Sequence, residues 1–480
     1  MSTSVRRLCG VLLAMSLTLS ACGSTSRDEA REATSERGPA ASEAAEDAAR
    51  GESRGRRGSG PNGSAGDSDP SGGTVGDAQR VSTARGGKIR IGVHVSQNAN
   101  AANQFGVARL PVTGPGEIAA IVGWINAHGG IGGRRVEHFV HVTDPLDGTF
   151  DAQAQAACED LAQDKKVFAV VSRSLTPSNV LPACLAQHKV PLVWELHKVL
   201  TRGTTAKYRP FLYRPSLADG DRLAFIVEGL ARSGFYGRSA RVAIVRYDTA
   251  EHEFVSKRIF RPALKKIGVS VVDEAAVSEA RGASDAGSVS AQSSNAVLRF
   301  QSSGVTHVLF VPTGAALPLL FMAAAEGQGF RPAYGLSTLD PPGFLAANHG
   351  ASQLAKAAVV GWQPAIDTEA QYDPRPNTGA SKLCHDIIRG AGFDGAQARF
   401  AEPYCDGLFF LKRALERTGR ISADALRIGV ESIRGSFDSP WAFGSRFGPG
   451  RYDGTAEVRN MKYNAACSCF NYAGEPYDVR

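Results

Sequence analysis

The chain has 480 residues, of which 43% are apolar and 21% are charged, and its formal net charge is +7. Lysine and arginine are interleaved with aspartate and glutamate, so the basic excess forms no run and argues against a nucleic-acid-binding protein. Beyond residue 19 no apolar run reaches the length that spans a membrane.

The N-terminus has the features of a secretory signal. Two arginines precede an apolar run over residues 8–19, and small residues follow it. This order is typical of a signal peptide, and the run is short for a membrane span. Cys22, directly after Leu-Ser-Ala, resembles a bacterial lipobox and implies cleavage before Cys22 and lipidation of its thiol. The alternative is an ordinary signal peptide with a chance cysteine. We expect a signal peptide over residues 1–21 and an extracytoplasmic chain held to the cell membrane by lipid on Cys22.

Residues 22–87 have the composition of a tether. They are rich in Gly, Ser, Ala and mixed charge and contain almost no large apolar side chains. Such a segment buries too little surface to offset its ordering entropy. As a flexible coil it reaches about 45 Å, so it would hold a folded body clear of the bilayer.

The first part of the folded body alternates strands with helices. The apolar runs predict four strands, and the amphipathic stretches between them predict three helices of about a dozen residues, as in parallel β-α-β units. The strands are expected at residues 88–95, 134–142, 166–172 and 190–195, and the helices at 116–128, 150–164 and 178–189.

The same pattern then repeats. Strands are expected at 240–248, 269–277, 306–312 and 332–337, with helices at 253–268, 290–304 and 316–329. This internal duplication predicts an α/β protein with two doubly wound parallel-sheet lobes joined by a hinge. Helices near 379–391, 402–418 and 422–434 are expected to complete the first lobe. The expected boundaries are 88–212 for the first part of lobe 1, 213–337 for lobe 2, 338–445 for the second part of lobe 1, and 446–480 for a last crossing and cap.

Six cysteines follow the lipidation site, an even number that favours disulfides in an exported protein. Six cysteines allow about 15 connectivities, which sequence alone does not resolve. We favour local pairs, with a zinc site made from the last four as the alternative. The favoured pairs are Cys158 with Cys184, Cys384 with Cys405, and Cys467 with Cys469.

The stretch HGGIGG (128–133) invites comparison with a phosphate-binding loop. A dinucleotide fingerprint runs strand, glycines, helix, so that phosphate meets a helix N-terminus. Here the order is reversed, and Arg135 stands where the third glycine is needed. Gly129 and Gly130 instead suit the C-terminal cap of a helix.

Signatures of catalysis or cofactor binding are scarce. The only G-x-S-x-G match, at residues 51–55, lies in the tether, where no strand-turn-helix unit is expected. His138 and His141 lie three apart on a predicted strand and would face opposite sides. We therefore predict no catalytic residue, no cofactor and no metal.

The best candidate site lies at the carboxyl ends of the parallel strands, where ligands bind in open α/β sheets. Hydroxyl, aromatic and carboxylate side chains at these ends suit a small polar or zwitterionic ligand. The candidates are Ser174, Thr176, Trp194, Glu195 and His197 in the first lobe, and Asp248, Glu251, His252 and Ser337 to Asp340 in the second.

The runs INAHGGIGGRRVE (125–137) and VTDPLDGTFDAQAQAACEDLAQDKKVFAVVS (142–172) resemble extracytoplasmic solute-binding proteins of branched-chain amino acid ABC transporters. The resemblance implies the type I periplasmic binding fold, a clamshell that closes on its ligand and docks on a permease. Matched to that family, the ligand contacts fall on Phe105 and near Ser174, Thr176, Trp194, Glu195, Glu251 and Ser337. WELH (194–197) departs from the small hydroxyl residues that the family has after its fourth strand.

These observations predict a lipid-anchored solute-binding protein that delivers an amino acid-like ligand to an ABC importer and catalyses no reaction itself. The expected partners are a small-molecule ligand, the membrane through Cys22 and an ABC permease, with no nucleic acid and a monomeric state. Two alternatives are a ligand sensor that acts on a signalling partner and an exported hydrolase or cell-wall interaction protein on the same scaffold.

Overall fold

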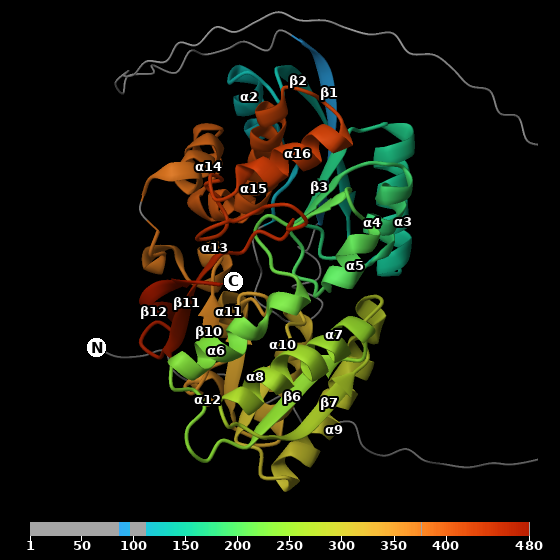
Figure 1. The fold of residues 1–480 in the computed structure, drawn as a ribbon. Coiled ribbons are helices and arrows are strands. Elements are labelled where there is room, and N and C mark those ends of the chain that lie inside the picture. Colours follow the sequence, from blue (N-terminus) through green and yellow to red (C-terminus); the bar gives the residue numbers. More distant parts are fainter. Residues whose placement is uncertain (1–85, 97–111, 376, 480) are drawn as a thin grey trace, which may run out of the picture. The chain divides into compact units, whose positions relative to one another are not determined.

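A computed structural model of the chain describes residues 86–96, 112–375 and 377–479 (Figure 1). The predicted signal peptide, Cys22, the tether up to residue 85 and Phe105 lie outside these residues. The described residues form two sheets, and each sheet is the centre of one lobe. Within the described part, no helix is long and apolar enough to cross a membrane.

Lobe 1 is built on a parallel sheet with the strand order β2-β1-β3-β4-β5. Its central strands are buried on both faces, which explains why they read as continuous apolar runs such as AVVS and LVW. The strands are β1 (Gly86–Ser96), β2 (Arg134–Thr143), β3 (Ala169–Ser172), β4 (Leu192–Trp194) and β5 (Leu212–Tyr213).

Helices cover both faces of this sheet. Apolar side chains of α2, α14, α15 and α16 form one core with β1 and β3, and those of α3 and α4 form another on the opposite face. The helices are α2 (Pro115–Ala127), α3 (Phe150–Cys158) continued by a π turn (Glu159–Asp164), α4 (Val180–Gln187), α5 (Arg202–Lys207), α14 (Gly379–Gly390), α15 (Gly395–Thr418) and α16 (Ala423–Ile433).

Lobe 2 has the strand order β12-β11-β10-β9-β8-β6-β7. The five strands from β10 to β7 are parallel, whereas β11 is antiparallel to both of its neighbours. The strands are β6 (Val242–Tyr247), β7 (Val271–Val277), β8 (His307–Phe310), β9 (Ala333–Ser337), β10 (Ala358–Gly361), β11 (Glu457–Asn464) and β12 (Cys469–Asp478).

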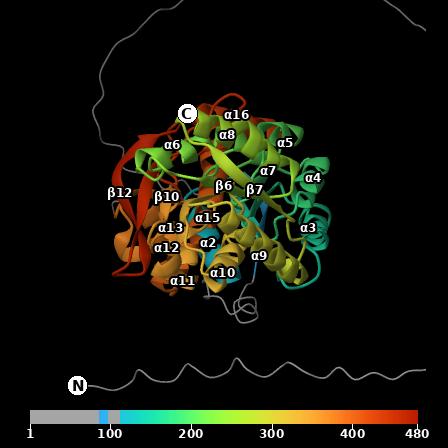
Figure 2. The ribbon, with the colours of Figure 1, turned by 90° about the horizontal axis from the view of Figure 1, so that it is seen from below.

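Two helix layers sandwich the sheet of lobe 2. Figure 2 shows β6 and β7 between α6 and α8 on one side and α9 and α10 on the other, and the two apolar cores of the lobe have the same division. The helices are α6 (Ala224–Arg232), α7 (Ala250–Phe254) continued by a π turn (Val255–Phe260), α8 (Arg261–Lys266), α9 (Ala286–Ser302), α10 (Ala316–Gly327), α11 (Pro342–Asn348) and α12 (Ala351–Leu354). Both lobes are thus doubly wound, as the repeat predicts.

The structure moves one expected boundary. The chain was expected to return to lobe 1 at residue 338, but α11, α12 and β10 still belong to lobe 2, and the helices that complete lobe 1 begin with α14 at Gly379. The C-terminal residues add β11 and β12 to the sheet of lobe 2. β10 has only four residues between short helices, so its apolar period is too short to identify it as a strand.

The chain passes between the lobes three times, in crossing segments 214–223, 362–375 and 434–456, which include α13 (Pro364–Asp367). The three segments meet at the carbonyl oxygen of Ser216. It accepts hydrogen bonds from Trp362 Nε1 (3.0 Å), Gln363 Nε2 (2.9 Å) and Thr455 Oγ1 (3.1 Å). This cluster makes the crossing segments one connected hinge.

The HGGIGG stretch ends α2 and turns the chain into β2. Gly129 and Gly130 have φ values of 88° and 70°, in the left-handed region that favours glycine. A Cβ on Gly130 would lie 1.9 Å from the carbonyl oxygen of Arg134. The glycines therefore build a turn, as the reversed order of elements predicts.

Three disulfides join the pairs that the sequence analysis favours. Cys158–Cys184 links α3 to α4, Cys384–Cys405 links α14 to α15, and Cys467–Cys469 closes the turn between β11 and β12. The last four cysteines are thus engaged in disulfides rather than in a zinc site.

Candidate ligand-binding site

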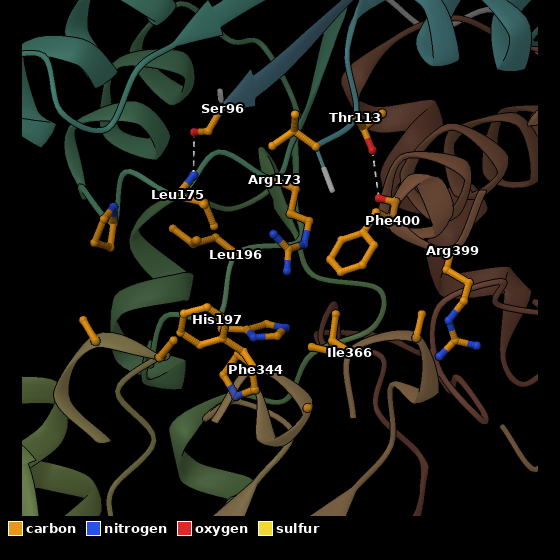
Figure 3. Close-up of a pocket in the computed structure, with 18 of the residues that line it drawn as sticks. Ser96, Thr113, Arg173, Leu175, Leu196, His197, Phe344, Ile366, Arg399 and Phe400 are labelled. Carbon is orange, nitrogen blue, oxygen red and sulfur yellow. Dashed lines mark hydrogen bonds between the residues drawn. The ribbon is translucent and has the colours of Figure 1, made fainter. Parts of the chain in front are cut away.

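A cavity of about 1240 Å³ lies between the two lobes, at the carboxyl ends of the parallel strands. Its wall takes residues from lobe 1, lobe 2 and the second crossing segment. Much of the wall is apolar, and Figure 3 shows Leu196, Phe344, Ile366 and Phe400 facing the same space. Such a cavity suits an organic ligand with an apolar body, oriented by a few polar groups.

The most distinctive polar group of the wall is Arg173, in the loop that follows β3. Figure 3 shows its guanidinium pointing into the space among Leu196, Ile366 and Phe400. The Nε atom is buried and has no hydrogen-bond partner, and among the described residues no carboxylate lies within ion-pair distance of the guanidinium. The guanidinium carbon of Arg173 lies 5.6 Å from the centroid of the Trp441 ring. Burial lowers the pKa of Arg173, against the opposing effect of Tyr404 and Glu195.

Behind Arg173 lies a buried pair of carboxyl groups, Glu195 and Asp406, which hydrogen-bond to each other. Glu195 accepts a further hydrogen bond from Ser216, and Asp406 accepts one from Ser439. Burial, and then the neighbouring Asp406, raise the pKa of Glu195 well above its ordinary value. The raised pKa favours the neutral form of Glu195, which brings no full negative charge to Arg173.

His197 lies between Arg173 and the hinge. Its Nε2 is 2.7 Å from Oε1 of Gln363, whose amide nitrogen donates to Ser216. Because Gln363 Oε1 is an acceptor, Nε2 of His197 carries the proton. Burial and the nearby Arg173 lower the pKa of His197 to about 3, so the ring is neutral at physiological pH.

Lobe 2 faces the same region with the N-terminus of α10. The wall includes Thr313, Gly314 and Ala315, and the first turn of α10 contains no acidic residue and no side-chain cap. Thr313 Oγ1 is buried and has no hydrogen-bond partner. A Cβ on Gly314 would lie 3.7 Å from the carbonyl oxygen of His197, so this turn is close to the His197 side of lobe 1.

The other buried cations of the wall are paired. Arg375 lies 2.7 Å from Asp373 and 2.9 Å from Glu402, and Arg399 lies 3.0 Å from Asp373. Lys198 pairs across the lobes with Glu279, at 2.8 Å. Main-chain contacts join the lobes beside this pair, where the Phe150 amide donates to the Arg281 carbonyl at 2.7 Å.

Of the predicted ligand contacts, His197 lines the cavity and Phe105 lies outside the described residues. The other six are not part of the described wall, because their polar atoms are engaged inside the lobes or their side chains are packed. Ser174 bonds Ser96 at 2.7 Å and Thr176 at 2.8 Å, while Ser337 donates to Asp340 at 3.0 Å. Trp194 and Glu195 are fully buried, and Glu251 accepts from Thr204 at 3.1 Å.

Asp248, His252 and Asp340 are further lobe 2 candidates with side chains that could bind a ligand. His252 lines the cavity, whereas Asp340 is buried beneath it and accepts from the amide of Thr313 at 3.2 Å. Asp248 forms an ion pair with Arg246 at 3.6 Å and is not part of the described wall.

Two wall residues escaped the sequence analysis although their positions offered a signal. Arg173 and Thr313 each follow a strand at its carboxyl end, where ligands bind in such sheets. Phe344, Ile366 and Phe400 carried no signal, since they lie in segments whose approach to the cleft depends on the tertiary fold.

A metal site finds no support among the described residues. The one group with suitable spacing is Cys158, Cys184 and His188, and both sulfur atoms of this group form a disulfide.

Comparison with protein families decides the relationship. The model of the family described as "Periplasmic binding protein" matches residues 116–461. The chain belongs to this family. It has the type I periplasmic binding protein fold, which it shares with solved solute-binding proteins of ABC transporters. A comparison of the sequence with curated proteins gives no match.

Solved structures of this type share the fold of the periplasmic binding protein. A Rhodopseudomonas palustris ABC-transporter solute-binding protein in complex with 4-hydroxybenzoate has a TM-score of 0.58 and 16% identity, over 82% of this chain and 97% of its own. A Thermus thermophilus branched-chain amino acid ABC transporter protein with bound valine has a TM-score of 0.57 and 15% identity, over 81% and 96%. A Desulfitobacterium hafniense substrate-binding protein in complex with Leu has a TM-score of 0.55 and 16% identity, over 80% and 100%.

Proposed function

We propose that the protein is a lipid-anchored extracytoplasmic solute-binding protein, which captures a small organic ligand between its lobes and delivers it to an ABC importer. The observation that carries this proposal is the cavity between the lobes, whose wall is mainly apolar and includes residues of both lobes. The bound molecules of the structural neighbours, 4-hydroxybenzoate, valine and Leu, are of the size and kind that such a cavity suits.

Binding would work by hinge closure. A ligand that contacts both lobes at once favours the arrangement in which the lobes are close, so binding shifts the population toward it. The three crossing segments that meet at Ser216 supply the hinge, and Lys198–Glu279 supplies a contact that forms only when the lobes meet. Catalysis forms no part of this proposal.

Among the predicted ligand contacts, His197 lines the cavity, and we propose that it contacts the ligand. For Ser174, Thr176, Trp194, Glu195, Glu251 and Ser337, direct contact with a ligand stays a prediction, and so does the role of Phe105.

A thermal-shift screen of amino acids, amides, peptides, sugars and organic acids tests the proposal. We expect one chemical class to raise the melting temperature, and the same compounds to make the protein more compact in X-ray scattering. The proposal would be contradicted if no compound of the library raised the melting temperature, or if binding occurred without compaction. Turnover of the bound compound would favour the exported-hydrolase alternative.

The lipid anchor has its own test. We expect the wild-type chain, expressed in a bacterium that processes lipoproteins, to fractionate with the membrane, and Cys22→Ala to release it. Equal membrane association of both chains would exclude the anchor.

A further inference from the structure

The charged groups of the cavity wall favour an anionic ligand over a cationic one. Its described carboxylates are Glu279, Glu369 and Asp373, and each is already engaged. Glu279 pairs with Lys198, Asp373 with Arg375 and Arg399, and the exposed Glu369 accepts from Gln371 at 2.5 Å. An α-ammonium group placed in this cavity would therefore find no free carboxylate among the described wall residues.

Arg173 presents the opposite situation, a cation without a carboxylate partner among the described residues. A desolvated guanidinium is costly unless an anion or hydrogen-bond acceptors satisfy it, and its planar fork matches a carboxylate. The carboxyl group behind it, Glu195, hydrogen-bonds to Asp406 and Ser216 and is not within ion-pair distance. A ligand is thus the missing acceptor for the guanidinium.

Lobe 2 also favours an anionic ligand. The N-terminus of α10 carries partial positive charge from its unpaired amide groups, and no acidic side chain of its first turn neutralises it. The hydroxyl of Thr313 is 9% exposed, has no hydrogen-bond partner in the described part of the chain, and stands at this end as a donor. His197 lies beside both features, since burial and then Arg173 lower the pKa of His197, and the His197 carbonyl lies close to Gly314.

We infer that the ligand is a small carboxylate with an apolar body and no ammonium group, and that Arg173 receives its carboxylate. The body of the ligand would lie against Leu196, Phe344, Ile366 and Phe400, and Thr313 would donate to the same anion from lobe 2. This inference rests on the proposed function and replaces the amino acid-like ligand expected from the resemblance.

Two matched ligand sets test the ligand class by calorimetric titration of the purified chain. One set is 4-methylpentanoate, leucine and 4-methylpentanamide, and the other is 3-phenylpropanoate, phenylalanine and 3-phenylpropanamide. We expect at least one carboxylate to bind, and to bind at least about tenfold more tightly than the amino acid and the amide of its set. The inference is overturned if the amino acid or the amide binds as tightly as its carboxylate, or if neither carboxylate binds while compounds of another class do.

Variants of Arg173 test whether this residue binds the carboxylate of the ligand. Arg173→Gln is expected to weaken the carboxylate at least about tenfold and to leave the weak binding of the amide unchanged, with Arg173→Lys between the two. Arg238→Gln, at an exposed surface position, is the matched control for loss of one positive charge. Equal carboxylate affinity in wild type and Arg173→Gln, with both chains folded by circular dichroism, would remove Arg173 from the site.

The two levels of the proposal fail in different ways. If amino acids bind and compact the protein, the solute-binding function stands and the carboxylate inference is wrong. If no compound of any class binds, the solute-binding function itself fails and the inference fails with it.

Discussion

Arg173 and Arg375 are two guanidinium groups on the wall of one cavity, and they differ in what surrounds them. Arg375 is held by Asp373 and Glu402 and donates to the carbonyl of Pro440 at 2.6 Å. Burial works against its charge, but Glu402 and Asp373 together raise the pKa of Arg375. Arg173 has no such ring of acceptors, and burial lowers its pKa.

This difference indicates a structural role for Arg375 and a ligand-binding role for Arg173. The partners of Arg375 come from the chain itself, so its charge is satisfied before any ligand arrives and joins the second crossing segment to α15. The partner of Arg173 is missing from the described residues, and a protein tolerates an unsatisfied buried cation where a ligand completes it. The two arginines therefore respond differently to the same substitution.

The largest effect is expected for Arg375→Gln. Removing this cation leaves the fully buried Glu402 without its main partner, and breaking a buried ion pair costs about 3–5 kcal/mol of unfolding free energy. Urea unfolding measures the loss. Arg331→Gln, which breaks a surface pair with Glu326, is the control and should cost less than about 1 kcal/mol. A similar, small loss for both variants would contradict the structural role of Arg375.

The next effect concerns the carboxyl group behind Arg173. Its pKa is raised in the folded protein, so the stability that it contributes is fully present below the unfolded pKa and is lost as the pH rises through the folded pKa. Glu195→Gln keeps the hydrogen bond and removes the ionisation. We expect it to match the wild type at pH 5 and to be about 1–2 kcal/mol more stable at pH 8, measured by urea unfolding.

The exposed Glu475→Gln serves as the control for this pH profile. Parallel stability profiles for the wild type and Glu195→Gln would show that Glu195 is ionised at neutral pH. Arg173 would then have a charged neighbour, and its contrast with Arg375 would weaken.

A smaller effect, of opposite sign to that of Arg375→Gln, is expected for the stability of ligand-free Arg173→Gln. The substitution removes a partly buried charge that has no carboxylate partner among the described residues, so the variant should be as stable as the wild type or up to about 1 kcal/mol more stable. Thermal and urea unfolding without ligand measure this. A loss of stability comparable to that of Arg375→Gln would mean that partners within the chain hold Arg173.

The smallest effect extends the comparison to two threonines. Thr313→Val replaces an unpaired buried hydroxyl, so stability should change by less than about 0.5 kcal/mol while carboxylate affinity falls about two- to fivefold. Thr338 donates to Asp367 at 2.7 Å and accepts from the Trp362 amide at 2.7 Å. Thr338→Val should therefore cost about 1–3 kcal/mol. Equal losses of stability for Thr313→Val and Thr338→Val would show that the two hydroxyl groups do not differ in their hydrogen bonding.

Much of the fold is readable in the sequence. The eight predicted strands exist, the HGGIGG turn ends α2, and the favoured cysteine pairs form. These features depend on local signals, namely apolar period, glycine conformation and short separation along the chain. β10, β11 and β12 were missed as strands of lobe 2 because β10 is short and because β11, with β12 paired to it, joins the sheet through β10, which lies far back in the chain.

The candidate site was only partly readable. Sequence position identified the strand ends, and His197 and His252 do line the cavity there. It did not distinguish polar groups that face the cavity from those that face the protein. Ser174 and Ser337 look like free donors in the sequence, but Thr143 from another strand engages Ser174, and Asp340 in the same loop accepts from Ser337.

The sequence by itself therefore determined the two-lobed doubly wound architecture, because the alternation and repetition of apolar runs are properties of neighbouring residues. Only the tertiary structure decided which charges are satisfied. Glu402, on α15, reaches Arg375 in the second crossing segment, whereas no carboxylate of the described residues reaches Arg173. Whether a buried charge has a partner depends on contacts between distant segments, and that dependence makes Arg173 visible as a binding group only in the folded chain.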